Sequence, residues 1–236
     1  LNWIGHNIIK KVHIEIGGQI IEEHYGEWMH IWNELSQDKG KQEGYANMVG
    51  NVPRLTQVIQ GNNNSDKSSS TIPETTLYIP LQFWFCRNPG LALPLISLQY
   101  HEVKIKITFA SASTGGETLS SLNTKLWCEY IYLDTDERRR FAQVSHEYLI
   151  EQVQHSSVAR SSSNTNIKLN FNHPVKELIW TDANSVYYDN AKLQLNGHDR
   201  FAKQPPEYFQ LKQVSDYHTC VPSQNFPAPS HNTISI

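Results

Sequence analysis

The sequence predicts an all-β protein whose strands pair antiparallel and pack as sandwiches. Only 18% of its 236 residues are charged, below the roughly 25% of an average globular protein, and Asn, Gln, Ser and Thr supply most of the polar side chains. This composition suits strands and turns better than long surface helices. Apolar residues also alternate in several short runs, two of which end in the turn dipeptides Gly17-Gly18 and Asn196-Gly197, as is typical of β-hairpins.

The first run extends from Trp3 to Ile21 and carries an apolar residue at every second position from Val12 to Ile16. Because Gly17-Gly18 tolerates the positive φ angles of a primed turn, we expect a hairpin here. Apolar residues then recur at helical spacing from Tyr25 to Leu35, which predicts a short amphipathic helix on the edge of the sheet.

Glu22, Glu23 and His24 stand together at the end of this hairpin. Carboxylates beside an imidazole are typical of metal sites and of acid/base catalysis. A solvated strand end is the simpler interpretation of the same three residues, and it is the one that we favour.

The most apolar stretch, Leu77 to Ile107, predicts two strands joined by a tight turn. Its aromatic run ends at Phe85, Arg87 to Gly90 carry turn chemistry, and alternation resumes at Leu98. Such a hairpin needs cover over its apolar face, so we interpret much of the remaining chain as partner strands.

Residues 38–60 are polar and rich in turns, with one helical turn expected from Tyr45 to Val49. Gly61 to Thr71 form a low-complexity polar loop. Asn63 begins an Asn-Asn-Ser glycosylation sequon, but such motifs arise often by chance in Asn-rich loops, so we favour an unmodified loop.

Lys125 to Leu133 predict a further strand, and a charged stretch follows it that ends in Arg138, Arg139 and Arg140. These three arginines can be interpreted as a phosphate or nucleic-acid patch. The acidic residues beside them leave little net field, so a charged linker is favoured. Residues 141–154 are expected to form a strand or an amphipathic segment.

A second β block contains strand-like runs at Ile167 to Phe171, Val175 to Trp180 and Ala191 to Phe201. The Pro-rich tail that begins at Pro205 is expected to be extended or looped. The runs that end in Gly-Gly and in Asn-Gly share one alternating order, which indicates two copies of a single β unit.

Charge and cysteine content argue against several classes of function. A formal net charge of -3 provides no general field for nucleic acid or an anionic membrane. Cys86, Cys128 and Cys220 lie far apart and outside any zinc-binding spacing, so we predict neither a disulfide framework nor a metal site. No apolar run is long enough to span a bilayer, and no residue pattern calls for a cofactor.

In several long runs the identity of each residue, and not only an alternating pattern, is distinctive. These runs are Trp3 to His6, Ile14 to Gln19, His24 to Trp28, Leu81 to Ile96, Gln99 to Val103, Asp134 to Ala142 and Asn172 to Leu178. These runs resemble the major capsid proteins of nucleocytoplasmic large DNA viruses, the group of the iridoviruses and phycodnaviruses. The resemblance covers nearly the whole chain.

The resemblance implies a tandem double jelly roll, which consists of two antiparallel β-sandwiches with short helices in their loops. Residues 1–140 are then the first roll, 141–155 an inter-roll linker and 156–236 the start of the second. The first strands of the first roll and the closing strands of the second are expected to be missing. Cys86 becomes a small buried residue in the wall of the first roll.

The resemblance also implies a structural role without enzymatic activity. Three chains would form a pseudo-hexagonal capsomer, and capsomers would join minor capsid proteins in the icosahedral shell of a virion assembled in the host cytoplasm. Contact with an inner viral membrane would run through the minor proteins, without direct nucleic-acid contact. Arg138, Arg139 and Arg140 are then expected between the rolls or between subunits, and Asn63 on the outer surface.

Two other functions remain open. A carbohydrate-binding or glycan-active jelly roll would stack aromatic side chains on sugars and place two carboxylates at the bond, with Glu102, Glu129, Asp134 and Asp136 as candidates. Aromatic strands more often form the core, so catalysis is not favoured. The other function is that of a minor capsid or spike protein with the same fold.

Overall fold

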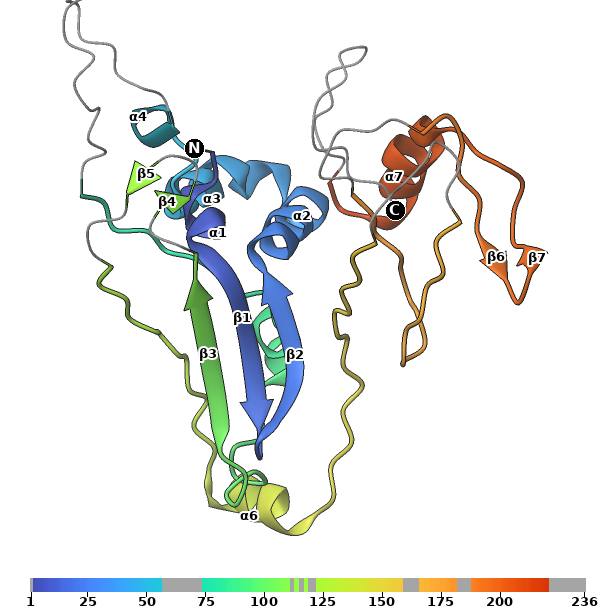
Figure 1. Cartoon of the computed structure of the whole chain (residues 1–236). Coiled ribbons are helices and arrows are strands. Elements are labelled where there is room, and N and C mark those ends of the chain that lie inside the picture. Colours follow the sequence, from blue (N-terminus) through green and yellow to red (C-terminus); the bar gives the residue numbers. More distant parts are fainter. Residues whose placement is uncertain are drawn as a thin grey trace, which may run out of the picture. The chain divides into compact units, whose positions relative to one another are not determined.

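The structure is a computed structural model that describes residues 2–56, 74–110, 113–114, 117–118, 122–158, 166–181 and 188–220 (Figure 1). The chain divides into two compact units. Unit 1 comprises Leu1–His30 and Glu43–Gln154, and unit 2 comprises Ile31–Gln42 and His155–Ile236. Within the described ranges, no helix combines the length and the hydropathy that crossing a membrane requires.

A three-stranded antiparallel sheet forms the centre of unit 1. The short helix α1 (Ile4–Ile8) leads into β1 (Ile9–Ile16), and a turn with φ of 59° at Gly17 and 84° at Gly18 connects it to β2 (Gln19–Tyr25). The predicted hairpin is therefore confirmed. Much later in the chain, β3 (Val103–Phe109) pairs with the other edge of β1, which gives the strand order β2-β1-β3.

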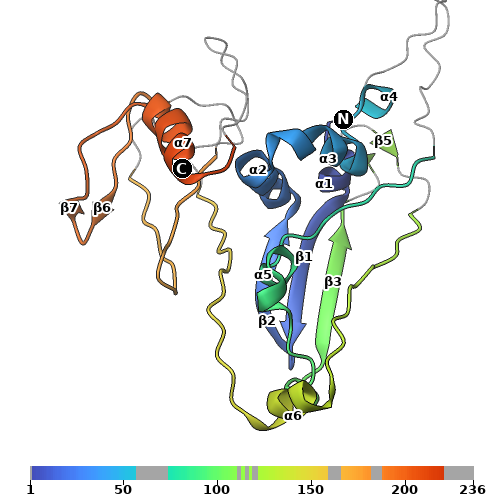
Figure 2. The same cartoon turned by 180° about the vertical axis from the view of Figure 1, so that it is seen from behind.

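The two faces of this sheet differ in polarity. Val12 and Ile14 are fully buried on the apolar face, where the helix α5 (Trp84–Arg87) covers them, as Figure 2 shows. The opposite face carries cross-strand ion pairs, for example between Lys11 and Glu23 at 2.8 Å. The core of unit 1 therefore lies between the sheet and the segment that precedes β3.

The predicted hairpin within Leu77 to Ile107 is wrong. Described residues before β3 form α5 and the 3-10 turn η2 (Pro89–Leu91) instead of a strand, and β3 begins only at Val103. In a strand, Trp84 would point away from its neighbours Phe83 and Phe85. A helical turn instead lets all three aromatic side chains pack in the same core cluster.

The same stretch contains one further prediction that is wrong, the burial of Cys86, and one that is confirmed, the turn at Asn88. Cys86, predicted to be buried, is exposed, because the first turn of α5 directs the neighbouring aromatic side chains into the core. The turn chemistry of Asn88 is confirmed, since its side-chain oxygen accepts a hydrogen bond from the backbone N–H of Gly90 at 2.9 Å.

The amphipathic helix predicted after the first hairpin is confirmed as α2 (Gly26–Ser36), in which Met29 and Leu35 are fully buried. The following polar segment is more helical than the single turn expected. It contains the 3-10 turn η1 (Lys39–Lys41), α3 (Gln42–Val49) and α4 (Pro53–Thr56). Residues 57–73, which include the whole predicted polar loop with Asn63, lie outside the described residues.

The later part of unit 1 contains less strand than predicted. A two-residue ladder joins β4 (Ser113–Thr114) to β5 (Glu117–Thr118). Lys125 to Leu133 form no strand, so that prediction is wrong. A strand needs a partner with free backbone groups, and the described sheet places none against these residues.

Unit 2 contains the second predicted hairpin. The strands β6 (Gln194–Leu195) and β7 (His198–Asp199) flank Asn196 and Gly197, whose φ angles are 52° and 83°. The runs at Ile167 to Phe171 and Val175 to Trp180 form no strand beyond a single bridge residue at Trp180, so two of the three predicted strands are wrong.

The described part of the tail after Pro205, which ends at Cys220, is largely helical rather than extended. It forms the π-helical turn η3 (Tyr208–Gln213) and the helix α7 (Val214–Tyr217). Proline is tolerated at the first turn of a helix, so Pro205 and Pro206 mark a start rather than a break. Val214 packs in a buried cluster with Leu35. Each hairpin with a primed turn is thus followed by a helix. The sequence repeat predicts the two hairpins but not the helix after the second one.

We expect Gly26→Ala to destabilise unit 1 strongly. A Cβ at Gly26 would lie 2.2 Å from the carbonyl oxygen of His6 and 2.7 Å from that of Ile9, and backbone atoms cannot rotate away. The free energy of unfolding should fall by more than about 3 kcal/mol, measured by denaturant titration. Gly44→Ala in α3 is the control: nothing lies within 4 Å of its added Cβ, so we expect a gain of about 0.5 to 1 kcal/mol. Similar effects from the two variants would contradict the packing described.

Candidate functional site

The three arginines singled out in the sequence lie on the helix α6 (Thr135–Gln143). The Asp134 carboxylate accepts a hydrogen bond from the backbone N–H of Glu137 at 3.0 Å and caps the helix. The charged stretch is therefore a helix, and its role as a linker stays a prediction. An Asp followed three residues later by Glu is a typical helix start, and this signal was present in the sequence.

Arg138, Arg139 and Arg140 are all exposed. Arg139 also contacts Asp136 within α6, with 3.5 Å between Nη1 and Oδ1. Successive residues of an α-helix are rotated by about 100°, so the three side chains project around most of the helix circumference. A single phosphate group cannot contact all three of them. The arrangement is better suited to a protein surface that surrounds the helix.

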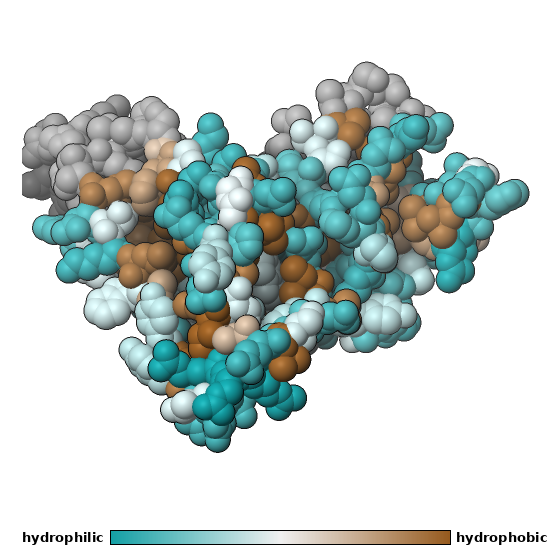
Figure 3. Space-filling model, turned by 90° about the horizontal axis from the view of Figure 1, so that it is seen from below, coloured by the Kyte–Doolittle hydropathy of each residue, from teal (hydrophilic) through white to brown (hydrophobic). Residues whose placement is uncertain are grey.

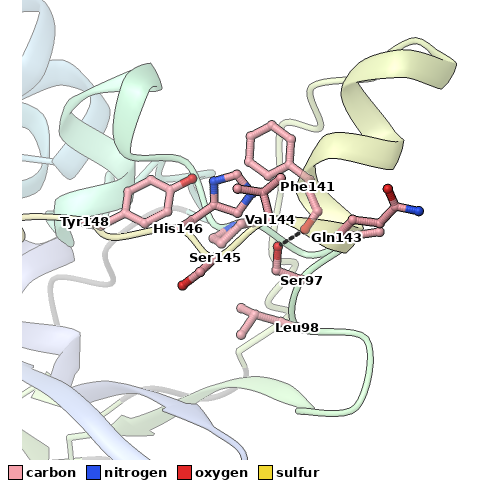
Figure 4. Close-up of a pocket in the computed structure, with 10 residues that line it drawn as sticks. Ser97, Leu98, Phe141, Gln143, Val144, Ser145, His146 and Tyr148 are labelled. Carbon is pink, nitrogen blue, oxygen red and sulfur yellow. Dashed lines mark hydrogen bonds between the residues drawn. The ribbon is translucent and has the colours of Figure 1, made fainter.

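The C-terminal end of α6 lines a hollow of about 370 Å³ (Figure 4). Phe141 stacks on His146 with 4.7 Å between ring centroids, and the Ser97 hydroxyl donates a hydrogen bond to the Phe141 carbonyl oxygen at 2.6 Å. The bond from Ser97 attaches α6 to the loop before β3. No carboxylate lines the hollow, and the Ser97 hydroxyl is bonded to a backbone carbonyl rather than to a base.

Glu22 and His24 form a buried polar pair, so the favoured interpretation of a solvated strand end is wrong. Glu22 Oε1 lies 2.8 Å from His24 Nε2, and neither side chain is exposed. Strand register explains their burial: His24 pairs with Val12 and Glu22 with Ile14, and side chains directly opposite in a sheet share a face. The His24 ring also stacks on Phe83 at 4.6 Å between centroids.

This pair holds a distant segment of unit 1 against β2. The backbone N–H of Val153 donates a hydrogen bond to Glu22 Oε1 at 3.0 Å, and Gln152 Nε2 donates one to the carbonyl oxygen of Ile21 at 2.8 Å. A substrate cannot reach fully buried side chains. Glu22 and His24 therefore have a structural role, in which they hold the backbone at Val153 against β2, rather than a catalytic or metal-binding one. We call this pair and its bond to Val153 the buried clasp.

The segment from Leu122 to Leu133 exposes large apolar side chains, although its sequence has the composition of a core strand. The exposed fraction is 84% for Trp127 and 93% for Tyr132, and Leu126, Tyr130 and Ile131 are more than half exposed. We call this segment the apolar ribbon. Figure 3, which views the molecule from below, likewise shows hydrophobic patches among hydrophilic residues. Exposed apolar groups of this size indicate a surface that another protein segment covers.

The carboxylates considered for glycan cleavage have other roles or stand alone. Glu102 pairs with Lys104 at 2.8 Å, Asp134 caps α6, and Asp136 contacts Arg139. Glu129 lies on the apolar ribbon. Across the part of the chain that the structure describes, no group of three His, Cys, Asp or Glu residues is placed to hold a metal ion.

Two family models match this chain. Residues 1–134 match the family described as major capsid protein N-terminus, and residues 137–190 match the large eukaryotic DNA virus major capsid protein. A major capsid protein of Pyramimonas orientalis virus is 54% identical over 94% of this chain and 56% of its own length. That of Paramecium bursaria Chlorella virus 1 is 35% identical over 87% of this chain and 56% of its own length. The chain thus spans about half the length of these relatives.

Solved structures resemble the fold as well. A quasi-atomic model of the PBCV-1 virus capsid contains a chain that is 31% identical, with a TM-score of 0.68 over 90% of this chain and 62% of that one. A crystal structure of PBCV-1 VP54, fitted into a reconstruction of the virophage Sputnik, gives a TM-score of 0.72 at 30% identity, over 99% of this chain and 65% of that one.

We expect Glu22→Ala to destabilise unit 1 by about 3 to 5 kcal/mol, because it leaves His24 and the Val153 N–H buried without their partner. Thermal or denaturant unfolding measures the loss. Glu23→Ala is a matched control on the adjacent residue: Glu23 faces the polar side of the sheet and bonds Lys11 and Tyr25, so its removal should cost at most about 1 kcal/mol. Equal losses would show that the Glu22 and His24 pair is not a buried clasp.

Proposed function

Because the chain belongs to the major capsid proteins of large eukaryotic DNA viruses, we propose that it is a structural subunit of the icosahedral shell of such a virus. The 54% identity to the Pyramimonas orientalis virus protein, which extends over nearly the whole chain, carries this proposal. The fold and the surface support it, because the described side chains offer an apolar ribbon and an exposed helix rather than a catalytic arrangement.

The proposed architecture is a tandem double jelly roll. Residues 1–140 contribute the first roll, residues 141–155 the linker and residues 156–236 the start of the second. Two observations support this division. Most residues before Gln154 fall in unit 1 and the residues after it in unit 2, which also includes Ile31–Gln42. A hairpin followed by a helix occurs early in the chain and again late in it.

We propose that three chains associate into a capsomer of pseudo-hexagonal outline. Closed cyclic symmetry requires that each subunit present one surface to its neighbour and receive another. Obligate interfaces bury on the order of thousands of Å² of mainly apolar surface, and the apolar ribbon offers surface of this kind. Neighbouring capsomers and minor capsid proteins are the further partners. The minor proteins mediate contact with the inner viral membrane, and nucleic acid is not contacted directly.

Arg138, Arg139 and Arg140 lie at the junction between the rolls or between subunits in this proposal. Their spread around α6 supports such a role, because a helix with cations on several sides can be surrounded by acidic groups of more than one neighbour. Asn63 belongs to the outer loops and is a candidate for glycosylation. The protein resides in the virion capsid after assembly in the host cytoplasm, without enzymatic activity or a cofactor.

We predict that the triple charge reversal R138E/R139E/R140E weakens trimers. Three new carboxylates would repel the acidic groups that the arginines contact. Multi-angle light scattering of the purified protein should give three times the single-chain mass for the unaltered protein and a shift toward one chain for the variant. The neutral variant R138Q/R139Q/R140Q should show a smaller shift in the same direction.

Reversing Lys10, Lys39 and Lys41, which are exposed elsewhere, provides the control with the same change in net charge. Its mass should equal that of the unaltered protein. An unchanged trimer mass in R138E/R139E/R140E would show that the three arginines do not lie in the subunit contact. A monomeric unaltered protein would instead argue against the capsomer itself.

A further inference from the structure

Two histidines, a tryptophan and a tyrosine form a cluster in unit 1 that sequence analysis did not single out, in which His6 and Tyr45 are buried and Trp3 and His30 half-buried. Trp3 precedes α1, His6 lies on α1, His30 on α2 and Tyr45 on α3. The Trp3 ring stacks on His6 with 5.6 Å between centroids and lies 4.8 Å from His30. The centroids of His6 and His30 are 5.9 Å apart. Four aromatic rings thereby join the start of the chain to two helices.

The surroundings of the two histidine rings favour their neutral form. His6 is 2% exposed and Tyr45 is 5% exposed, and His6 Nε2 lies 2.9 Å from the Tyr45 hydroxyl. The Nδ1 atoms of His6 and His30 are buried and have no hydrogen-bond partner among the described residues. A proton added at either ring would create a buried cation beside a second imidazole, without an acceptor for the new N–H.

Among the described residues, no carboxylate affects the pKa of either imidazole. The charged residues on the packed elements are Lys10, Lys11 and Glu15 on β1, Glu27 and Glu34 on α2, and Glu43 on α3. None of them contributes to the pKa of His6 or His30. Burial lowers the pKa of His6 from 6.5 to about 4, with repulsion from His30 as a second cause. Burial also lowers the pKa of His30 and raises that of Tyr45 to about 12.

We propose that Trp3, His6, His30 and Tyr45 form an acid-sensitive latch that holds the α1 segment against α2 and α3 at neutral pH and releases it when the imidazoles gain protons. Released histidines have an ordinary pKa near 6.5, whereas the latched His6 has a depressed one. The released state therefore binds more protons between about pH 6.5 and pH 4, and the latch weakens as pH falls through this range.

Only the segment around α1 is expected to open. The Trp3 backbone has a φ of 53°, a left-handed conformation that is uncommon for a bulky residue and that persists only while its contacts hold. The sheet core around Val12 and Phe83 is a separate cluster. Opening of the latch would thus expose the region of residues 2–8 and leave the sheet intact. A shell subunit with this device is closed at neutral pH and loosened in an acidic compartment.

Hydrogen–deuterium exchange of the purified protein at pH 7 and pH 5, corrected for intrinsic rates with an unstructured peptide, tests the proposal. We expect protection of residues 2–8 to fall at least tenfold at pH 5, since one histidine changes the opening equilibrium by about tenfold per pH unit. Protection at Val12 to Ile16 should not change. The variant H6Q/H30Q, whose side chains do not titrate, should lose the response to pH.

His13→Gln is the matched control, because His13 lies on the polar face near Glu23 and outside the latch; it should respond to pH as the unaltered protein does. Should H6Q/H30Q fail to fold, NMR titration of histidine-labelled unaltered protein decides the matter. The proposal predicts that His6 titrates well below pH 6. Titration of His6 near pH 6.5, equal protection of residues 2–8 at both pH values, or a full pH response in folded H6Q/H30Q would each overturn it.

Discussion

Burial of Phe83 and Trp84 against the apolar face of the β2-β1-β3 sheet is the interaction on which the rest of unit 1 depends. A small sheet with one apolar face is not stable alone in water. Each of these aromatic side chains contributes on the order of 4 kcal/mol when it leaves water. The same packing fixes the polar pair, because the ring of His24 stacks on Phe83, and Glu22 then holds the backbone of Val153 against β2.

This core determines what unit 1 presents to a neighbour. The sheet buries Phe83 and Trp84 from the stretch before β3, whereas the apolar ribbon after β3 stays exposed. The chain then turns into α6, which directs its arginines outward. Uncovered apolar and cationic surfaces of this kind are consistent with the proposed role of a shell subunit.

The sequence predicts those parts of the fold that depend on local backbone preference. Gly17-Gly18 and Asn196-Gly197 set positive φ angles and thereby locate both hairpins, and helical spacing locates α2. Predictions failed where long-range pairing decides the outcome: Lys125 to Leu133 have strand composition without a partner, and the aromatic run at Phe83 packs as a helical turn. The burial of Glu22 follows from strand register, which composition alone does not reveal. The helix α6 was predictable from its Asp134 cap.

The proposed function requires that copies of this chain form symmetrical capsomers of paired jelly rolls. Single-particle electron microscopy of the purified assembly tests it most directly, because outline and symmetry are seen together. The account predicts three-fold particles with six similar corners, two from each chain. Particles without three-fold symmetry, or single chains with one sandwich each, would contradict it.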